Sequence, residues 1–329
     1  MAEYQKPWLS VSEQIERLAK RGVDVGDRDE TSSLLNAVGY YRLTGYLFPF
    51  RSSEWVAGPD GQDALIILDD YQAGTSIAAA AALIDFDRQL RMLVLDGTER
   101  IEVSLRTSIG HLLGEVSAYA HTEPANFGPA FTEHGTDSQT GESLPSKLDQ
   151  WIERVEQRRD SSDEAFVAHF RDRYENKMPI WALTEIMEFG HLARLYAGLN
   201  NPLATKIAQW YGVPSKRVMA SWIASLNYVR NVAAHHARLF NRKLVVAPKR
   251  SSRGSIPALD HLSDHDSAKA RFGVYNALAV MAYLIGVIDP SCDWSRRAAE
   301  LILRFPPSGH ISTESLGAPA GWNKLALWQ

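Results

Sequence analysis

Apolar residues recur at three- and four-residue steps along most of the chain, a spacing typical of one face of an α-helix. Ser10 and Glu13 have the spacing of a capping box, and the apolar stripe that continues from Ile15 stops at Gly22. A first helix is therefore expected between these points. A second, short helix is expected over residues 31–38.

Residues 39–50 form a dense aromatic block that Pro49 closes. Such a block is typical of a core or a dimer contact, and stacking on nucleic-acid bases is the alternative. The polar, glycine-containing residues 51–74 indicate a loop with at most a short strand. Helical spacing returns over residues 75–116, as two helices or as one helix bent at Gly97.

Residues 117–147 show little periodicity and many turn-forming residues, so we expect an exposed insertion there. Further helices are expected over residues 148–158, 163–173, 182–199, 204–211, 215–236, 267–288 and 294–303. Residues 237–247 suit a short strand or an extended arm, and residues 248–267 suit a basic loop. Trp322 and Trp328 are expected to anchor the tail against the body.

The pattern predicts an all-α or nearly all-α fold in a single body. Within residues 1–329 we expect N-terminal helices and the aromatic block over 1–74, and a helical core over 75–116 and 148–288. Residues 289–329 complete the chain as a C-terminal helix and tail. The sequence contains no glycine-rich phosphate loop, His-Glu metalloprotease motif or Gly-x-Ser-x-Gly motif.

Composition supports a packed globular protein, since 45% of the residues are hydrophobic and nine are tryptophan. Cys292 is the single cysteine, which excludes an internal disulfide and suits a reducing cytoplasm. The N-terminus lacks an apolar segment of signal-peptide length. The longest apolar runs, residues 77–84 and 275–288, are shorter than the ~20 residues that a membrane span requires. We therefore expect a soluble, cytoplasmic protein.

The net charge of −4 does not by itself suggest a nucleic-acid partner, but its distribution does. The interval between Glu188 and Asp260 contains no acidic residue. It holds eleven basic ones, which are Arg194, Lys206, Lys216, Arg217, Arg230, Arg238, Arg242, Lys243, Lys249, Arg250 and Arg253. Such a segment produces a local positive field that favours a polyanion, unless its side chains scatter over several faces.

The most concentrated chemistry lies at the end of the helix expected over residues 215–236. At about 100° per residue, one apolar stripe enters the core, formed by Val218, Trp222, Leu226, Val229 and Ala233. His236 falls on the same buried side, unless the helix ends or kinks before it. Asn231 and His235 lie only about 40° apart on another face, whereas Arg230 and His235 are about 140° apart.

A neutral imidazole at His235 can accept a proton from a ribose 2′-hydroxyl, and its protonated form can donate one to a leaving 5′-oxygen. Arg230 carries a permanent charge and a planar fork that fits a phosphate, and Asn231 can orient the imidazole. The chemistry requires no metal or other cofactor. Because Arg230 and His235 point apart on one helix, a symmetric pair of copies is expected to complete the site.

Less specific interpretations remain open beside catalysis. An Asn–His pair at this spacing can simply cap a helix end. The protein can also keep its fold without being an enzyme, either as a module that binds RNA through Arg238, Arg242 and Lys243 or as a protein-interaction module.

Residues 227–242, with the sequence NYVRNVAAHHARLFNR, resemble the signature of the abortive-infection proteins of the AbiD/AbiF type, which belong to the HEPN superfamily. Further segments resemble that family in the same order, namely YQKPWL at 4–9, GYYRLTGY at 39–46, FDRQLR at 86–91, ERIEV at 99–103, LR at 105–106, PIW at 179–181, EIMEFG at 185–190, LGAP at 316–319 and GW at 321–322. Ala233 stands where relatives often have cysteine, and residues 117–146 match least.

The resemblance implies a HEPN-type helical bundle and a homodimer in which two Arg-x4-His motifs face each other. It implies metal-independent RNA cleavage that leaves a 2′,3′-cyclic phosphate, and a toxin-like role in halting the growth of phage-infected bacteria. Arg230, Asn231 and His235 take the positions of the catalytic residues, and His236 follows in the same signature. RNA is then the substrate, and a regulatory RNA or an antitoxin is a candidate partner.

Overall fold

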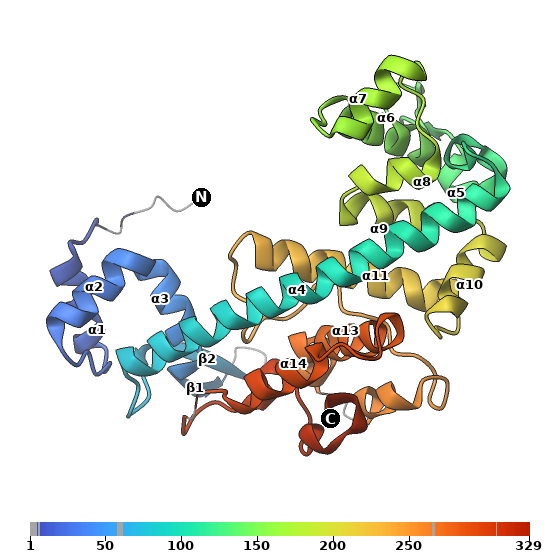
Figure 1. Cartoon of the computed structure of the whole chain (residues 1–329). Helices are drawn as coiled ribbons and strands as arrows, with labels where there is room; N and C mark the ends of the chain where they lie inside the picture. The colour runs from blue at the N-terminus through green and yellow to red at the C-terminus, as the bar shows by residue number, and fades with distance from the viewer. Residues whose placement is uncertain (1–4, 6, 58–61, 265–266, 307) are drawn as a thin grey trace. The chain divides into compact units, whose positions relative to one another are not determined.

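A computed structural model describes residue 5 and residues 7–57, 62–264, 267–306 and 308–329. This part of the chain is predominantly helical, as the periodicity predicts, with two small antiparallel sheets (Figure 1). It forms two compact units. The first comprises residues 1–90 and 301–315, and the second comprises residues 91–300 and 316–329. The sequence pattern alone treats the chain as one helical body.

The first unit begins with helices α1 (Val11–Lys20), α2 (Arg28–Val38) and α3 (Tyr40–Leu47), followed by the short helix η1 (Phe48–Phe50). The predicted capping box is present, because the Ser10 hydroxyl accepts from the Glu13 amide and the Glu13 carboxylate accepts from the Ser10 amide at 2.7 Å.

The aromatic block of residues 39–50 contributes much of the core of this unit. Leu43, Tyr46 and Phe50 are each no more than 1% exposed. The Tyr46 hydroxyl donates to the Asp87 carboxylate at 2.6 Å and so ties α3 to the first half of α4 (Ile77–Val116). The expectation of a core is confirmed for these residues, whereas Tyr41 is exposed.

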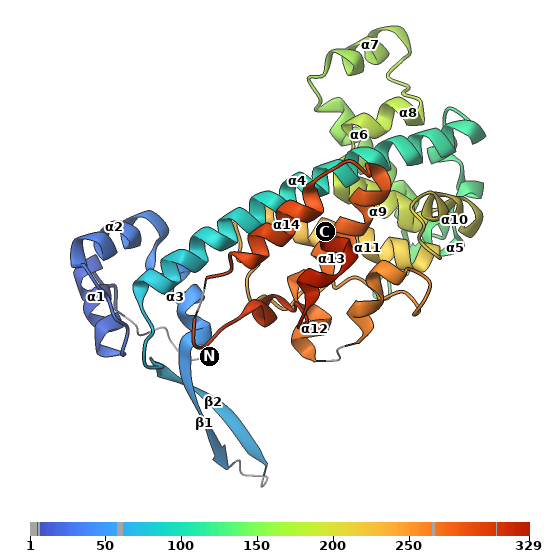
Figure 2. The same ribbon diagram turned by 60° about the horizontal axis from the view of Figure 1, so that its bottom comes forward.

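A β-hairpin occupies most of the segment expected to be a loop, so that expectation is wrong. Strands β1 (Arg51–Ala57) and β2 (Asp63–Tyr71) form an antiparallel hairpin (Figure 2). Trp55 lies opposite Leu65 in its register. Nearly all residues of both strands are exposed. Without a buried face, the strands lack the alternation of apolar and polar residues by which a sequence pattern identifies a strand.

Helix α4 is a single element, and Gly97 lies where other helices approach it closely. A Cβ on Gly97 would lie 2.5 Å from Met281 Cε and 2.7 Å from Trp294 Nε1. Met281 belongs to α13 (Val274–Ile288), and Trp294 begins α14 (Trp294–Leu303), whose bounds are those predicted. The glycine that suggested a bend is therefore a packing residue.

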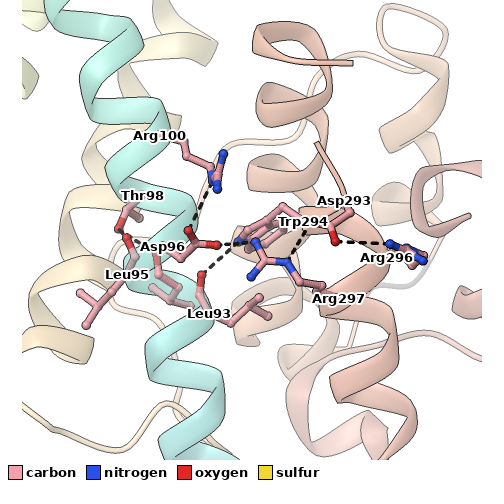
Figure 3. Close-up of polar contacts among 10 residues, drawn as sticks. Leu93, Leu95, Asp96, Thr98, Arg100, Asp293, Trp294, Arg296 and Arg297 are labelled. Atoms are coloured by element: carbon pink, nitrogen blue, oxygen red, sulfur yellow. Dashed lines mark hydrogen bonds and ion pairs between the residues drawn. The ribbon is translucent and has the colours of Figure 1, made fainter. Parts of the chain in front are cut away.

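Polar contacts hold the start of α14 on α4 beside this glycine (Figure 3). The Trp294 indole donates to the Leu93 carbonyl at 3.0 Å in a buried environment. Arg297 donates to the Asp96 carboxylate at 2.6 Å, and Arg100 contacts the same carboxylate at 3.3 Å. A buried tryptophan and a charge-assisted pair thus fix α14 at one position along α4.

The remaining elements lie in the second unit, apart from most of η6, which belongs to the first. They are η2 (Ala120–Thr122), η3 (Pro124–Asn126), α5 (Pro129–Thr132), β3 (Gly135–Thr136), β4 (Ser143–Leu144), α6 (Lys147–Asp160), α7 (Ala165–Arg173), α8 (Ile180–Leu183), η4 (Thr184–Ile186), α9 (Phe189–Gly198), α10 (Asn201–Trp210), α11 (Lys216–Ala234), η5 (Pro257–Ser263), α12 (Ala268–Phe272), η6 (Thr313–Leu316), η7 (Trp322–Lys324) and η8 (Ala326–Trp328).

The segment over residues 117–147 has a buried first half and an exposed second half. His121, Asn126 and Phe127 are buried, whereas residues 138–145 are exposed. Residues 237–247 form no strand, and the expected basic loop contains η5.

The C-terminal tail is anchored as predicted. Trp322 and Trp328 are 5% and 3% exposed, and the Trp328 indole donates to the Tyr275 hydroxyl at 2.9 Å. Within the residues that the structure describes, no helix has the length and apolar character needed to cross a membrane.

His121 is expected to make the stability depend on pH. His121 is only 6% exposed, and burial lowers the pKa of its imidazole from the ordinary 6.5 to about 4. The unfolded chain takes up this proton near pH 6.5 and the folded chain only near pH 4. The stabilisation is therefore complete above pH 6.5 and is lost as the pH falls through this window. At ~1.36 kcal/mol per pKa unit, the loss amounts to about 3 kcal/mol.

Urea denaturation of the wild type and of His121→Phe at pH 4 and pH 7 measures this contribution. The free energy of unfolding should fall less in the variant than in the wild type. His134→Phe is the matched control, because the His134 side chain is 63% exposed. An equal pH dependence in His121→Phe and the wild type would contradict the assignment.

Candidate active site

Helix α11 carries the predicted motif and is held by its apolar stripe. Ser215 caps its N-terminus by accepting from the Val218 amide, a role that serine favours at the start of a helix. Trp222, Leu226 and Val229 are no more than 1% exposed, whereas Val218 is half-buried. The stripe packs against α9 and α13. This packing fixes the rotation of α11 about its axis and with it the directions of the polar side chains.

The helix ends at Ala234, two residues before the predicted end. The His236 amide donates to the Ala233 carbonyl and the Ala237 amide donates to the Val232 carbonyl, each at 3.0 Å. These bonds form a Schellman motif, which requires a left-handed residue after the cap. His236 takes that position with φ of 56°.

The expectation that His236 points into the core applies only to a helix that neither ends nor kinks before this residue. Helix α11 ends at Ala234, and the left-handed turn breaks the helical phase. His236 is exposed, as is His235 at the cap position. Both histidine side chains are thus exposed at the C-terminal end of α11.

Arg230 and Asn231 form a bonded pair in the last turns of α11. Arg230 Nη1 donates to Asn231 Oδ1 at 3.2 Å, and both residues are half-buried. The Asn231 carbonyl also accepts from the His235 amide at 3.0 Å. The three predicted residues are therefore linked, two through their side chains and the third through the backbone.

Asn231 orients a different partner from the one predicted. Its carboxamide contacts the Arg230 guanidinium, and among the described residues it makes no bond to the His235 imidazole. The imidazole itself has no bonding partner in the described part of the chain. The site thus combines a guanidinium whose position is fixed with an accessible imidazole that can act as acid or base.

One carboxylate approaches Arg230 from another helix, and the sequence pattern missed it. Glu102 of α4 is buried, and Arg106 Nη2 donates to its carboxylate at 2.5 Å. Burial raises the pKa of Glu102. The charges of Arg106 and Arg230 oppose that shift, and the charge of Glu188 adds to it. Glu188 caps the start of α9.

The sequence signal that could have found Glu102 is its position four residues before Arg106, because oppositely charged residues at this separation pair on a helix. Such a pair is typical of a solvated helix face, because charge alternation does not reveal which face another helix covers. In the structure Glu102 is buried, Arg106 is half-buried, and the charge of Arg230 acts on Glu102.

The predicted RNA-binding residues partly bond to the protein itself. Arg242 Nε donates to the Arg238 carbonyl at 2.6 Å, and its Nη1 donates to the Tyr228 hydroxyl at 3.4 Å. The Lys243 ammonium lies 4.9 Å from the centre of the Phe272 ring. Arg242 therefore joins the segment after the helix back onto α11, and the involvement of these residues in RNA binding stays a prediction.

Residues outside the acid-free interval neutralise some of its cations. Lys206 pairs with Glu115 at 3.0 Å, and Arg253 pairs with Asp264 at 3.1 Å. The eleven cations are therefore not all available to a polyanion. Among the described residues, no group of three or more His, Cys, Asp or Glu is placed to hold a metal ion. Independence of the chemistry from metals remains a prediction.

Backbone strain at His236 gives a first prediction for this site. A left-handed conformation disfavours residues with a Cβ, and glycine relieves it. His236→Gly should therefore be more stable than His236→Ala by about 1 kcal/mol, since both variants lack the imidazole and differ only in the backbone preference. Chemical denaturation of the two proteins measures the difference, and equal stabilities would contradict a strained cap.

Burial of Glu102 gives a second prediction. Because its folded-state pKa is raised, the ionised carboxylate destabilises the folded protein, and this effect grows as the pH rises from the ordinary value of 4.5 through the folded-state pKa. Glu102→Gln keeps an acceptor for Arg106 and removes the charge. Its free energy of unfolding should equal or exceed that of the wild type at pH 8, and the difference should shrink towards pH 4.

Glu102→Ala is the companion variant. It leaves the half-buried Arg106, whose buried Nε already lacks a partner in the described structure, without its carboxylate acceptor. This variant should lose about 1–3 kcal/mol of stability. A comparable loss in Glu102→Gln would mean that the ion pair with Arg106 outweighs the burial of the carboxylate.

Comparison with known proteins identifies the family of the chain. A family model for Abi-like proteins matches residues 33–241, which is more than half of the chain and includes all of α4 and α11 with Arg230, Asn231 and His235. No curated protein and no solved structure matches the chain. The chain therefore belongs to the Abi-like protein family, which suggests a role in abortive infection.

Proposed function

We propose that this protein is a ribonuclease of the HEPN type that acts as a dimer in bacterial abortive infection. One observation carries the proposal. At a single helix end, the Arg230 guanidinium is held by Asn231 while the exposed His235 imidazole stays unbonded among the described residues. Fixed positive charge beside a free acid–base group is what cleavage of a phosphodiester by an internal 2′-hydroxyl needs.

The reaction follows from these two groups. A neutral His235 accepts the proton of the ribose 2′-hydroxyl, and the 2′-oxygen attacks phosphorus. The bond to the 5′-oxygen breaks, and that oxygen takes a proton from an imidazolium. The products are a 2′,3′-cyclic phosphate and a 5′-hydroxyl end. Arg230 stabilises the negative charge that builds on the phosphoryl oxygens.

The protein interior supports the position of Arg230. Asn231 Oδ1 accepts a hydrogen bond from its guanidinium, and the Glu102 carboxylate lies near enough for the two charges to interact. A half-buried guanidinium loses less conformational freedom on binding a phosphate than a freely rotating one. We therefore assign Glu102 and Asn231 to positioning and Arg230 and His235 to catalysis.

Geometry at phosphorus favours a dimer. The attacking 2′-oxygen and the leaving 5′-oxygen lie on opposite sides of the phosphorus atom in an in-line displacement. A single imidazole therefore reaches one side only. A second copy of the helix end, related by two-fold symmetry, supplies a second imidazole for the other side. One His235 then acts as base and the other as acid.

Cleavage of a 5′-labelled RNA in the presence of EDTA tests the proposal. The wild-type protein should cleave the RNA and leave ends that carry a 2′,3′-cyclic phosphate. His235→Ala should lower the rate by at least about 100-fold because the proton transfers are lost. Arg230→Lys should also be impaired, since lysine keeps the charge but not the fork. His134→Ala is the control, because His134 is also exposed but lies far along the chain from the motif.

The same assay separates the competing interpretations. Cleavage that persists in His235→Ala, or that needs a divalent metal, would rule out the proposed mechanism. RNA that is bound by the wild type but never cut would favour a binding module. For the dimer, an excess of His235→Ala protomers mixed with the wild type should lower the activity by more than dilution does, because a mixed dimer keeps only one of the two imidazoles.

A further inference from the structure

A groove of about 760 Å³ opens on the first unit, away from the motif in sequence. The segment before α1, helices α1 and α3, and the adjoining parts of β1 and β2 line it. The family resemblance and the proposed chemistry leave this groove without a role. Its lining combines guanidinium groups with exposed aromatic rings.

Three arginines converge in this groove. The charges of Arg17, Arg21 and Arg51 all act to lower the pKa of the Tyr40 hydroxyl, against the effect of its burial, which shows that they lie around the same side chain. Asp69 is the acidic residue that lines the groove, and it pairs with Arg21 at 2.6 Å and with Arg51 at 3.2 Å. One carboxylate faces three cations, so the groove has a net positive charge that suits an anion.

One of the three arginine side chains of the groove is not engaged in polar contacts within the described protein. The side chain of Arg17, which lines the groove, makes no hydrogen bond or ion pair within the described residues. Arg51 lies over the rings of Phe48 and Tyr71, at 5.9 Å and 5.8 Å from their centres. These ring contacts and the pairing with Asp69 hold the Arg51 guanidinium in place at the groove.

The exposed aromatic rings that line the groove indicate which group the ligand carries besides phosphate. Trp8 is 85% exposed and Tyr41 is 79% exposed, although both line the groove. The Tyr40 and Tyr41 rings meet edge to face at 6.0 Å, which helps to fix the direction of the Tyr41 ring. Large rings at the surface beside guanidinium groups form the usual platform for unpaired bases, whose flat faces stack on them.

We propose that this groove binds single-stranded RNA, with the backbone phosphates at Arg17, Arg21 and Arg51 and the bases stacked on Trp8 and Tyr41. Single strands fit because a base in a duplex has no free face for the ring of a protein side chain. The proposal concerns a site distinct from the Arg–His motif and does not depend on cleavage. The groove binds RNA whether the motif is an enzyme or not.

Binding is measured with the full-length chain carrying His235→Ala, so that the RNA stays intact if the motif is catalytic. The probe is a fluorescein-labelled 12-nucleotide oligouridylate, followed by fluorescence anisotropy. Trp8→Ala and Tyr41→Ala should each weaken binding about 10-fold, because each removes a stacking platform. Trp8→Phe should retain most of the affinity, because phenylalanine keeps a flat ring at the same place.

Arg17→Ala tests the phosphate contacts. It should weaken binding and lower the slope of log affinity against log salt concentration by about 0.7, the value for one phosphate contact on a single strand. Matched controls are Arg28→Ala, an exposed arginine on α2 outside the groove, and Trp210→Ala, an exposed tryptophan on α10. Neither control should change the affinity, and thermal denaturation shows that all variants are folded.

Three results would overturn the proposal. Unchanged affinity in both Trp8→Ala and Arg17→Ala would place the RNA elsewhere. Equal competition by a duplex of the same length would exclude base stacking. Equal competition by uridine monophosphate would assign the groove to a mononucleotide. Loss of RNA cleavage in His235→Ala, or its absence in the wild type, bears on the motif alone, so the two proposals fail separately.

Discussion

The packing of α11 against α9 and α13 decides where every polar side chain of the motif can point. Burial of Trp222, Leu226 and Val229 holds the helix in one rotation, because turning it would expose these side chains to water. Arg230 then lies at the edge of the buried face, where Asn231 holds its guanidinium. A functional group fixed in this way needs little reorganisation to meet a phosphate, so the apolar stripe shapes the chemistry that the helix can perform.

The end of α11 shows how a local backbone event redirects side chains. A Schellman motif closes the helix at Ala234 and places a histidine, not a glycine, in the left-handed position. The turn moves His236 from the buried side of the ideal helix to the surface, next to His235. Strain of this kind is found at functional sites more than elsewhere, and here it brings two imidazoles to one exposed corner.

Charge in this protein is organised in space differently from its order along the chain. The acid-free interval contains Arg230, yet buried Glu102 lies close enough to act on its environment, and Asp69 approaches the arginines of the groove in the first unit. Glu102 is distant in sequence from Arg230, and Asp69 lies on a different element from Arg21 and Arg51. The electrostatic character of each site is therefore a property of packing. It decides how many guanidinium groups stay available for phosphate at the motif and at the groove.

The sequence by itself determined the helical character, the caps at Ser10 and Ser215 and the bounds of α14, because helix periodicity and capping depend on neighbours within about four residues. It also singled out the residues of the motif, since they are adjacent along the chain. Only the tertiary structure decided that Glu102 is buried near Arg230, that β1 and β2 pair, and that Gly97 admits Trp294. The contacts of Glu102 and Gly97 join segments that are distant in sequence, and a linear pattern of apolar and polar residues does not show which face a partner will cover. The hairpin has no buried face and therefore no alternating pattern that would identify its strands.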